Sequence, residues 1–271
     1  MSTIDFSKFA IQAVEQITWI GISNNDILAV LSEPKDCNIE VGGDTVYASG
    51  GKGNPKLVSF GHSKMVSLKA NNAVYETGAL ANSFGSATPL VGATSGAYKT
   101  EVLTVSATNT ITTTYTPVIR ADDTYVSYAR KQYANGGLGD RYVEDSVAAT
   151  GKFSVSGQTI TFDASDVDEG DKIVVCYNYL AGSTTSTLKV QSDKFANTVK
   201  CIIDVYVKDM CNDDEYAAQF IIPKLKLMEE VSFALNNSGD PAIFNISGES
   251  LKPCNSTDLL DFKIIDEDGA V

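Results

Sequence analysis

The sequence predicts a mainly β protein, in which a β-sandwich or β-barrel is flanked by one short α-helix. Short runs rich in Val, Ile, Thr, Tyr and Phe, the residues that favour strands, recur along the 271 residues. Turn-forming residues separate these runs, as in all-β sandwiches and barrels. No fixed-period repeat and no low-complexity linker divides the chain. A chain of this length buries roughly three-quarters of its unfolded surface, so a full core is feasible.

The first 50 residues mix helical and strand patterns. Apolar residues between Phe6 and Ile17 recur at helical spacing and predict a helix, whereas Thr18–Ile20 favours a strand. Two further strands are predicted at Ile27–Leu31 and Cys37–Val41. The segment Ser32–Asp36 is the predicted turn between them.

A strand near residues 57–69 is predicted to lead into a short helix within Asn71–Gly85. An Asn is available as N-cap, and Gly85 can end the helix in a left-handed conformation. Four residues share one helical face: Ala73, Thr77, Leu80 and Phe84. We therefore expect this helix to pack on a sheet, with Gly78 as its weak point.

The remainder of the chain has the composition of sheet. Residues 98–184 are predicted to form a β-rich insertion or an extension of the same sheet, while residues 1–97 and 185–271 form the sandwich or barrel core. Strands are predicted at Ile111–Thr116, Lys152–Val155, Thr159–Phe162, Lys172–Tyr179, Ile202–Val207, Phe220–Lys226, Val231–Leu235, Ile243–Ile246 and Leu260–Ile265.

Charge and composition exclude several functional classes. The chain carries 21 Lys and Arg residues against 34 Asp and Glu residues, a net charge of −13. This charge disfavours a sequence-reading nucleic-acid binder, because such binding depends on cationic groups that displace counterions. The N-terminus lacks a signal-peptide pattern, and no window approaches 18 uninterrupted apolar residues. We expect no membrane partner.

The cysteines are odd in number, widely spaced and without a C-x-x-C pair, which gives no support for a zinc ribbon or a thioredoxin-like site. They are Cys37, Cys176, Cys201, Cys211 and Cys254. Free thiols, mostly buried, are expected in a reducing cytoplasm.

The stretch GGKGNPK (Gly50–Lys56) places glycines around lysines, as phosphate-binding loops do. A P-loop requires Ser or Thr after its lysine, but Gly53 follows Lys52 and Leu57 follows Lys56. A turn leading into a strand is therefore predicted. His62, the one histidine of the chain, rules out a multi-histidine metal site and is predicted to be structural or exposed.

Two acidic segments resemble ligand loops only superficially. DASDVDEGD (Asp163–Asp171) lacks the EF-hand spacing, since its glycine comes at position five and the twelfth residue is Tyr177. We predict a solvated hairpin loop between Phe162 and Lys172. The second segment, Asn212–Glu215, is also predicted to be a loop.

No catalytic, cofactor-binding or metal-ligating residue is assigned, and no cofactor is expected. The G-x-S-x-G elbow is absent, and the S-x-x-K spacings at Ser32/Lys35, Ser49/Lys52 and Ser186/Lys189 lack their companion motifs. Paired carboxylates of a glycan hydrolase stay open, because that geometry is set in space. The sequence favours a protein that is not an enzyme.

The segment Phe195–Pro253 resembles bacteriophage tail tube (major tail) proteins. The residues that carry the resemblance are FIIPKLKL (Phe220–Leu227), SGDPAIF (Ser238–Phe244) and LKP (Leu251–Pro253), with further likeness in KLVSFGHSK (Lys56–Lys64) and DEGDKIVVCYNY (Asp168–Tyr179). Residues 86–150 lie outside the resemblance, and the Thr-rich middle exceeds what a minimal tube subunit needs.

The resemblance implies a virion protein whose subunits form hexameric rings that stack into a conduit for DNA ejection. Strands of neighbouring subunits would complete an inner barrel, and a long loop or hairpin would join neighbours. The implied partners are further copies, tape measure, sheath and baseplate or connector proteins, and DNA in passage, with assembly in the host cytoplasm. The alternative is a capsid decoration, head-fibre or baseplate protein with an Ig-like binding module.

Overall fold

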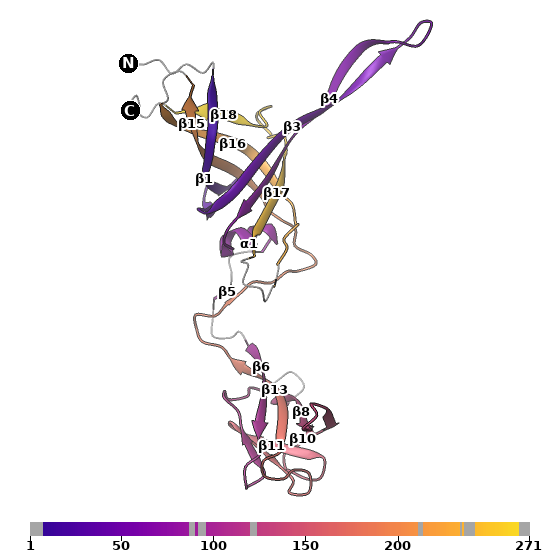
Figure 1. The fold of residues 1–271 in the computed structure, drawn as a ribbon, viewed down its shortest axis with the longest axis vertical. Coiled ribbons are helices and arrows are strands. Elements are labelled where there is room, and N and C mark those ends of the chain that lie inside the picture. Colours follow the sequence, from indigo (N-terminus) through magenta and orange to yellow (C-terminus); the bar gives the residue numbers. More distant parts are fainter. Residues whose placement is uncertain are drawn as a thin grey trace. The chain divides into compact units, whose positions relative to one another are not determined.

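The regular secondary structure of the protein consists mainly of antiparallel strands (Figure 1). The computed structural model describes residues 8–86, 90–91, 96–119, 124–210, 214–233, 235 and 242–265. Strands account for 56% of the chain and helix for 3%, which confirms the predicted mainly β class with one short helix.

The chain divides into two compact units. Unit 1 comprises Met1–Pro89 and Leu188–Val271, and unit 2 comprises Leu90–Thr187. The sequence placed the corresponding boundaries at residues 97/98 and 184/185. The role of unit 1 as a tube-like core stays a prediction.

Unit 1 contains one eight-stranded sheet, to which both ends of the chain contribute. Its order is β2-β1-β15-β16-β17-β4-β3, and β18 pairs with β16 beside β17. The strands are β1 (Phe9–Gly21), β2 (Ile27–Leu31), β3 (Pro34–Ser49), β4 (Lys56–Asn72), β15 (Thr198–Asp209), β16 (Glu215–Leu227), β17 (Phe244–Ser250) and β18 (Asp261–Ile264). This sheet confirms the predicted strands at Ile27–Leu31 and residues 57–69, and those that begin at Ile202, Phe220, Ile243 and Leu260.

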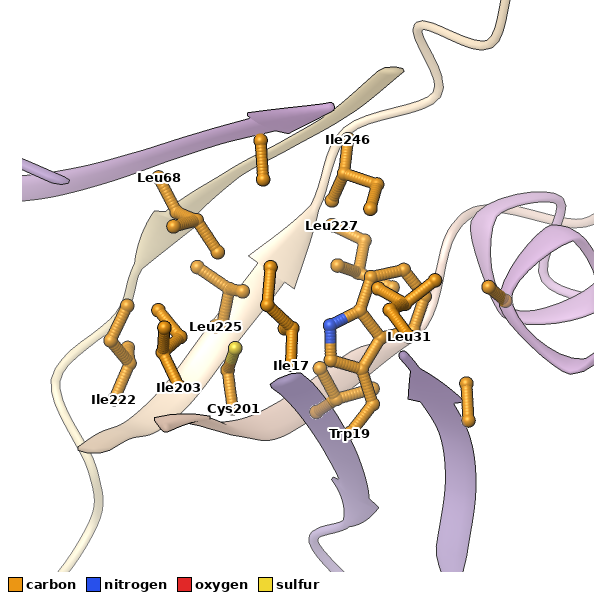
Figure 2. Packing of buried hydrophobic residues seen from close by; sticks show 14 of the residues in the cluster. Ile17, Trp19, Leu31, Leu68, Cys201, Ile203, Ile222, Leu225, Leu227 and Ile246 are labelled. Carbon is orange, nitrogen blue, oxygen red and sulfur yellow. The ribbon is translucent and has the colours of Figure 1, made fainter. Parts of the chain in front are cut away.

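Alternating side chains of these strands form the core of unit 1. Strand β15 illustrates the pattern, because Val199, Cys201 and Ile203 are fully or almost fully buried while the residues between them are half-buried. Figure 2 shows Trp19 and Leu31, from β1 and β2, packed into the same cluster, and both are 0% exposed. Burial of such side chains contributes about 1.5–3 kcal/mol each to folding.

The short helix α1 (Thr77–Ser83) lies against β2, as the sequence predicts for a helix packed on a sheet. Leu80 is 8% exposed and belongs to the core cluster. Gly78 is required by the close approach, since a Cβ there would lie 2.7 Å from the Leu28 carbonyl oxygen. Gly85, with φ +63°, ends the helix as predicted. The predicted Asn cap is wrong, because the N-cap residue is Glu76 and makes no side-chain capping bond.

The N-terminal helix predicted between Phe6 and Ile17 is wrong for the described residues, which form β1. Two register shifts, between Ile11 and Ala13 and between Val14 and Gln16, interrupt the pairing of β1 with β15. Each bulge inserts one residue and reverses the alternation of side chains between the two faces. The apolar residues therefore lose the period of two, and their spacing imitates a helix. Phe6 lies outside the described residues.

Two other strand predictions of unit 1 need correction. Pro34–Asp36 belongs to β3 rather than to a turn, and β3 continues eight residues past the predicted end at Val41. The predicted strand Val231–Leu235 is wrong, since its described residues make no strand. Aromatic contacts hold this segment instead: Tyr75 stacks on Phe233 with ring centroids 5.3 Å apart. The Tyr75 hydroxyl also donates to the Ser232 carbonyl (2.9 Å).

In its described residues, unit 2 contains two four-stranded sheets and one short strand pair. The sheets have the orders β10-β11-β12-β7 and β6-β13-β8-β9, and β5 pairs with β14. Their strands are β5 (Leu90–Val91), β6 (Gly96–Thr104), β7 (Thr110–Thr112), β8 (Val126–Gln132), β9 (Leu138–Arg141), β10 (Val143–Glu144), β11 (Lys152–Ser156), β12 (Thr159–Phe162), β13 (Lys172–Leu180) and β14 (Ser186–Thr187). The hairpin β11–β12 and strand β13 confirm three predicted strands.

The predicted strand Ile111–Thr116 ends earlier than expected, at Thr112. The hydroxyl of Thr113 lies within hydrogen-bond distance of two carbonyl oxygens, those of Tyr115 (2.8 Å) and Gln158 (3.1 Å), and shares its one proton between them. The Thr113 N–H still donates to the Gln158 carbonyl (2.9 Å), so the side-chain contacts accompany the end of the ladder. The backbone N–H of Tyr115 lies within 3.1 Å of the Tyr177 hydroxyl oxygen.

Candidate functional site: the arm and the open edges of unit 1

The most unusual feature of unit 1 is a long two-stranded ribbon. Beyond residues 67–72, where β4 pairs with β17, the outer part of β4 has β3 as its sole strand partner among the described residues. We call residues 42–65, the outer parts of β3 and β4 with their turn, the arm. In Figure 1 the arm runs past the ends of the other strands of the sheet.

The arm has one apolar face. Val46 pairs with Phe60, and Ala48 pairs with Val58. Directly opposed residues of an antiparallel pair project to the same face, so these four side chains form one stripe. The exposed fractions are 50% for Val46, 53% for Val58 and 60% for Phe60. The stripe therefore lies open to solvent in the isolated subunit.

The opposite face of the arm is more polar. Tyr47 pairs with Ser59, and the Lys56 ammonium lies 3.7 Å from the centroid of the Tyr47 ring. The strands are joined by Gly50–Pro55, in which the Gly50 N–H donates to the Pro55 carbonyl (3.2 Å). Gly51 and Gly53 adopt φ values of +84° and +90°. The glycines thus serve a turn that leads into a strand, as the sequence predicts.

His62 lies on the arm and is exposed, in agreement with its predicted structural or exposed role. Its Nδ1 lies 3.0 Å from the Ser63 hydroxyl and 3.9 Å from an Asp44 carboxylate oxygen. Both contacts involve the same ring nitrogen. A Ser-His-Asp relay uses one nitrogen for each partner, so this arrangement does not form one.

A hollow of about 540 Å³ separates the first half of β1 from the base of β3. Its lining is mainly apolar and includes Ile11, Val14, Cys37, Ile39, Ile203 and Phe220. Within the described chain, β3 pairs with β4 alone, and residues 9–16 of β1 pair with β15 alone. Both strands therefore border the hollow with unpaired edges, which are templates for further strands.

The thiol of Cys37 in this hollow is a poor nucleophile. Burial, with a smaller contribution from the Asp36 charge, raises the pKa of Cys37 to about 11, so the thiol is protonated at neutral pH. Four of the five cysteines lie in the described residues, and all four are free. Of these four, Cys201 alone is buried. The prediction that most thiols are buried is therefore wrong for the described cysteines. Cys211 lies outside the described residues.

The acidic segment Asp163–Asp171 is a loop, as predicted, but not a hairpin. It joins β12 and β13, which belong to different sheets. Asp166 accepts a hydrogen bond from the Gly151 N–H (2.6 Å), and Asp171 pairs with Lys131 (2.5 Å). Local donors thus engage these carboxylates. No group of three or more His, Cys, Asp or Glu residues that suits a metal ion occurs in the described part of the chain.

The second acidic segment lies partly outside the described residues. Glu215 begins β16, and the Asp214 carbonyl accepts a hydrogen bond from the Asp209 N–H (3.0 Å). Asn212 and Asp213 are not described. Among the residues that the structure covers, no helix has the length and apolarity needed to cross a membrane.

The apolar face of the arm and the unpaired edges of the sheet are surfaces that suit contacts with other proteins. Together with the mainly β fold, they are typical of a structural protein. The family model of the YomU/Tube protein family matches residues 9–262, and the chain therefore belongs to that family. This membership confirms the resemblance to tail tube proteins and indicates a phage tube-like structural protein and a virion component. No curated protein matches the chain.

Sequence reasoning missed the arm as a continuous ribbon. Gly42 and Gly43 interrupt the alternation at its base, and the strand prediction stopped at Val41. The signal that could have revealed it is the apolar residues at Val46 and Ala48 and at Val58 and Phe60 on either side of Gly50–Pro55, because a glycine-rich turn between two such runs is typical of a hairpin.

Proposed function

We propose that this chain is a tail tube subunit that self-assembles into stacked hexameric rings, which form the conduit for DNA ejection. Family membership supports the tube-like class, and the arm is the observation that carries the proposal. In this proposal the arm of one subunit packs on a neighbouring subunit.

The physical argument rests on the instability of an isolated ribbon. A two-stranded hairpin is at best marginally stable in water, and it gains stability when its apolar face is covered. The stripe of Val46, Ala48, Val58 and Phe60 has no such cover in the described subunit. Contiguous exposed apolar patches of this kind mark protein interaction sites. A neighbouring subunit is the cover that a self-assembling tube supplies.

The unpaired edges of β1 and β3 support a second kind of contact. A strand from an adjacent subunit can extend a sheet at such an edge, which joins neighbouring sheets through backbone hydrogen bonds. Contacts of this kind are heterologous, and they close into a ring when the rotation between subunits fits. The further partners in this proposal are tape measure, sheath and baseplate or connector proteins, with DNA passing through the bore and assembly in the host cytoplasm.

Negative-stain electron microscopy of the purified chain tests this proposal. Rings or tubes, alone or after addition of tail initiation proteins, are the expected result. Monomers that attach to capsids instead would favour the alternative decoration role. Sedimentation that shows monomers alone at high concentration, with initiation proteins present, would overturn self-assembly.

A further inference from the structure

One face of the β6-β13-β8-β9 sheet in unit 2 carries an unusual charge arrangement. Arg130 on β8 lies directly opposite Arg141 on β9, so both side chains project to the same face. They are two of the three arginines in a chain of net charge −13. Like charges directly opposite each other destabilise a sheet unless an anion lies between or beside them.

Among the described residues, Arg130 is the member of this pair that has no anionic partner. Its guanidinium lies 5.4 Å from the Tyr128 ring, and its Nε is buried without a hydrogen-bond partner. Within the described residues it makes no ion pair, whereas Arg141 already has an interaction of its own. Arg130 is thus held by an aromatic ring, with a planar set of donors suited to a carboxylate.

Aliphatic side chains extend the same face. Arg130 pairs with Val174 of β13, and Val174 pairs with Val102 of β6, which is 48% exposed. Tyr128 lies two residue pairs further along, opposite Cys176, and therefore on the same face. Arginine and tyrosine beside aliphatic residues are enriched where proteins bind proteins. We call Val102, Tyr128, Arg130 and Val174 the arginine face.

The same unit presents an acidic turn of matching charge at residues 168–171. Asp168 and Glu169 are exposed, and neither side chain makes an ion pair in the described part of the chain. The turn is well anchored, because Val167 is 3% exposed and the Gly170 N–H donates to the Val105 carbonyl (3.0 Å). A fixed backbone therefore presents these two exposed carboxylates, of which Asp168 also acts on Lys131 through its charge.

We propose that the arginine face binds the acidic turn of a second copy of this chain, with Arg130 pairing with Glu169 or Asp168. Charge complementarity carries the choice of occupant. The flat aliphatic surroundings of Arg130 suit a protein surface better than a hydrated anionic polymer, which would leave Val102 and Val174 exposed. Each copy carries both halves, so the contact can occur twice in one pair. The contact does not depend on the arm.

A charge exchange between copies tests this proposal. The test uses the full-length chain carrying Val46→Asp and Phe60→Asp as its background. These two substitutions remove the contacts that the arm of unit 1 would make. In this background we expect weak, salt-sensitive self-association in sedimentation. Arg130→Glu and Glu169→Arg should each weaken it at least about tenfold. An equimolar mixture of the two variants should restore association, because each variant then meets an opposite charge.

The matched control is Lys252→Glu, which makes the same charge change at an exposed residue of unit 1. A cooperative thermal unfolding transition like that of the background protein shows that each variant is folded. Equal association of the Arg130→Glu and Lys252→Glu variants would overturn the proposal, as would a mixture that fails to restore association. Absence of any association in the background up to the solubility limit would overturn it too. Persistence of tubes in that background would instead contradict the role of the arm.

Discussion

Val46 on β3 lies directly opposite Phe60 on β4, and both side chains remain at least half exposed. A cross-strand pair of this kind contributes roughly 0.2–1 kcal/mol, whereas burial of either side chain contributes about 1.5–3 kcal/mol. Most of the hydrophobic stabilisation that the pair can provide is therefore not realised within one subunit. Contact with another protein is the way to realise it.

Val46→Asp combined with Phe60→Asp should abolish tubes while the subunit stays folded, because the two changes put charges on a face that assembly covers. Electron microscopy measures assembly, and thermal unfolding measures folding. The control combines Thr45→Asp and Ser59→Asp, which make the same charge change on the opposite face. Normal tubes from the first variant would exclude the apolar face of the arm as an assembly contact.

Leu80→Asp should destabilise unit 1 by several kcal/mol, because it places an unpaired charge in a buried apolar contact of α1. Urea unfolding gives the free energy. Thr77→Asp is the matched control, since Thr77 is exposed in the first turn of the same helix, where a negative charge is favourable. Equal stability of the two variants would show that α1 is not packed as described.

Local pattern predicted much of this fold because several strands are both regular and bounded by turns. Lys172–Tyr179 is mostly apolar, as a strand of a core is, and β13 buries alternate side chains, at Ile173, Val175 and Tyr177. Gly157 marks the turn of the β11–β12 hairpin through its φ of +59°. In these segments the conformational preference of the backbone and the pattern of the side chains favour the same structure. That agreement is what allows structure to be predicted from sequence.

The failures share a physical cause, since long-range contacts decided them. The bulges of β1 depend on its pairing with β15, about 190 residues away, and no local signal announces them. The apolar run near Val231 is held by stacking of Phe233 on Tyr75 rather than by a ladder. The arginine pair of unit 2 is likewise invisible in the sequence, because Arg130 and Arg141 meet only through the register of β8 and β9.

Tyr177→Phe should destabilise unit 2 by about 1–3 kcal/mol, because its part-buried hydroxyl joins Glu101 to the Tyr115 backbone. Tyr98→Phe is the control, since Tyr98 is 71% exposed. The two variants are compared by urea unfolding near neutral pH. A Tyr177→Phe variant as stable as the Tyr98→Phe variant would show that the hydrogen bonds of the Tyr177 hydroxyl do not stabilise unit 2.

The hydrogen-bonded pair of Glu101 and Tyr177 should make the stability of unit 2 depend on pH. Burial raises the pKa of Glu101, but hydrogen bonds from Thr114 and Tyr177 outweigh it, so the pKa lies below its usual 4.5. The carboxylate's contribution to stability is therefore full above that value and is lost as the pH falls below it. Burial and Glu101 raise the pKa of Tyr177 from 10.0 to about 12, so its contribution is lost as the pH rises through that interval. Tyr177→Phe should flatten the alkaline loss and reduce the acid loss; unchanged slopes would contradict this assignment.

His62→Ala should leave both assembly and infectivity unchanged, because His62 is exposed and its polar side-chain contacts within the described residues are with Ser63 and Asp44 on the arm. Plaque counts of phage carrying the variant, with microscopy of their tails, measure both. Normal tails without infectivity would instead reveal a chemical role for this histidine.

A tube of these subunits should have an acidic or neutral bore, and isolated subunits should not bind DNA. A cationic wall would bind phosphates by releasing counterions, and DNA would then move slowly through it. The net charge of −13 is compatible with such a bore, and acidic residues on an outer surface would favour solubility. The acidic segments Asp166–Asp171 and Asp213–Glu215 are candidates for either location.

Fluorescence anisotropy with labelled duplex DNA should show no binding even at about 50 mM salt, where phosphate contacts are strongest. Binding that weakens steeply with added salt would refute the prediction, as would a tube structure with a bore lined mainly by Lys and Arg.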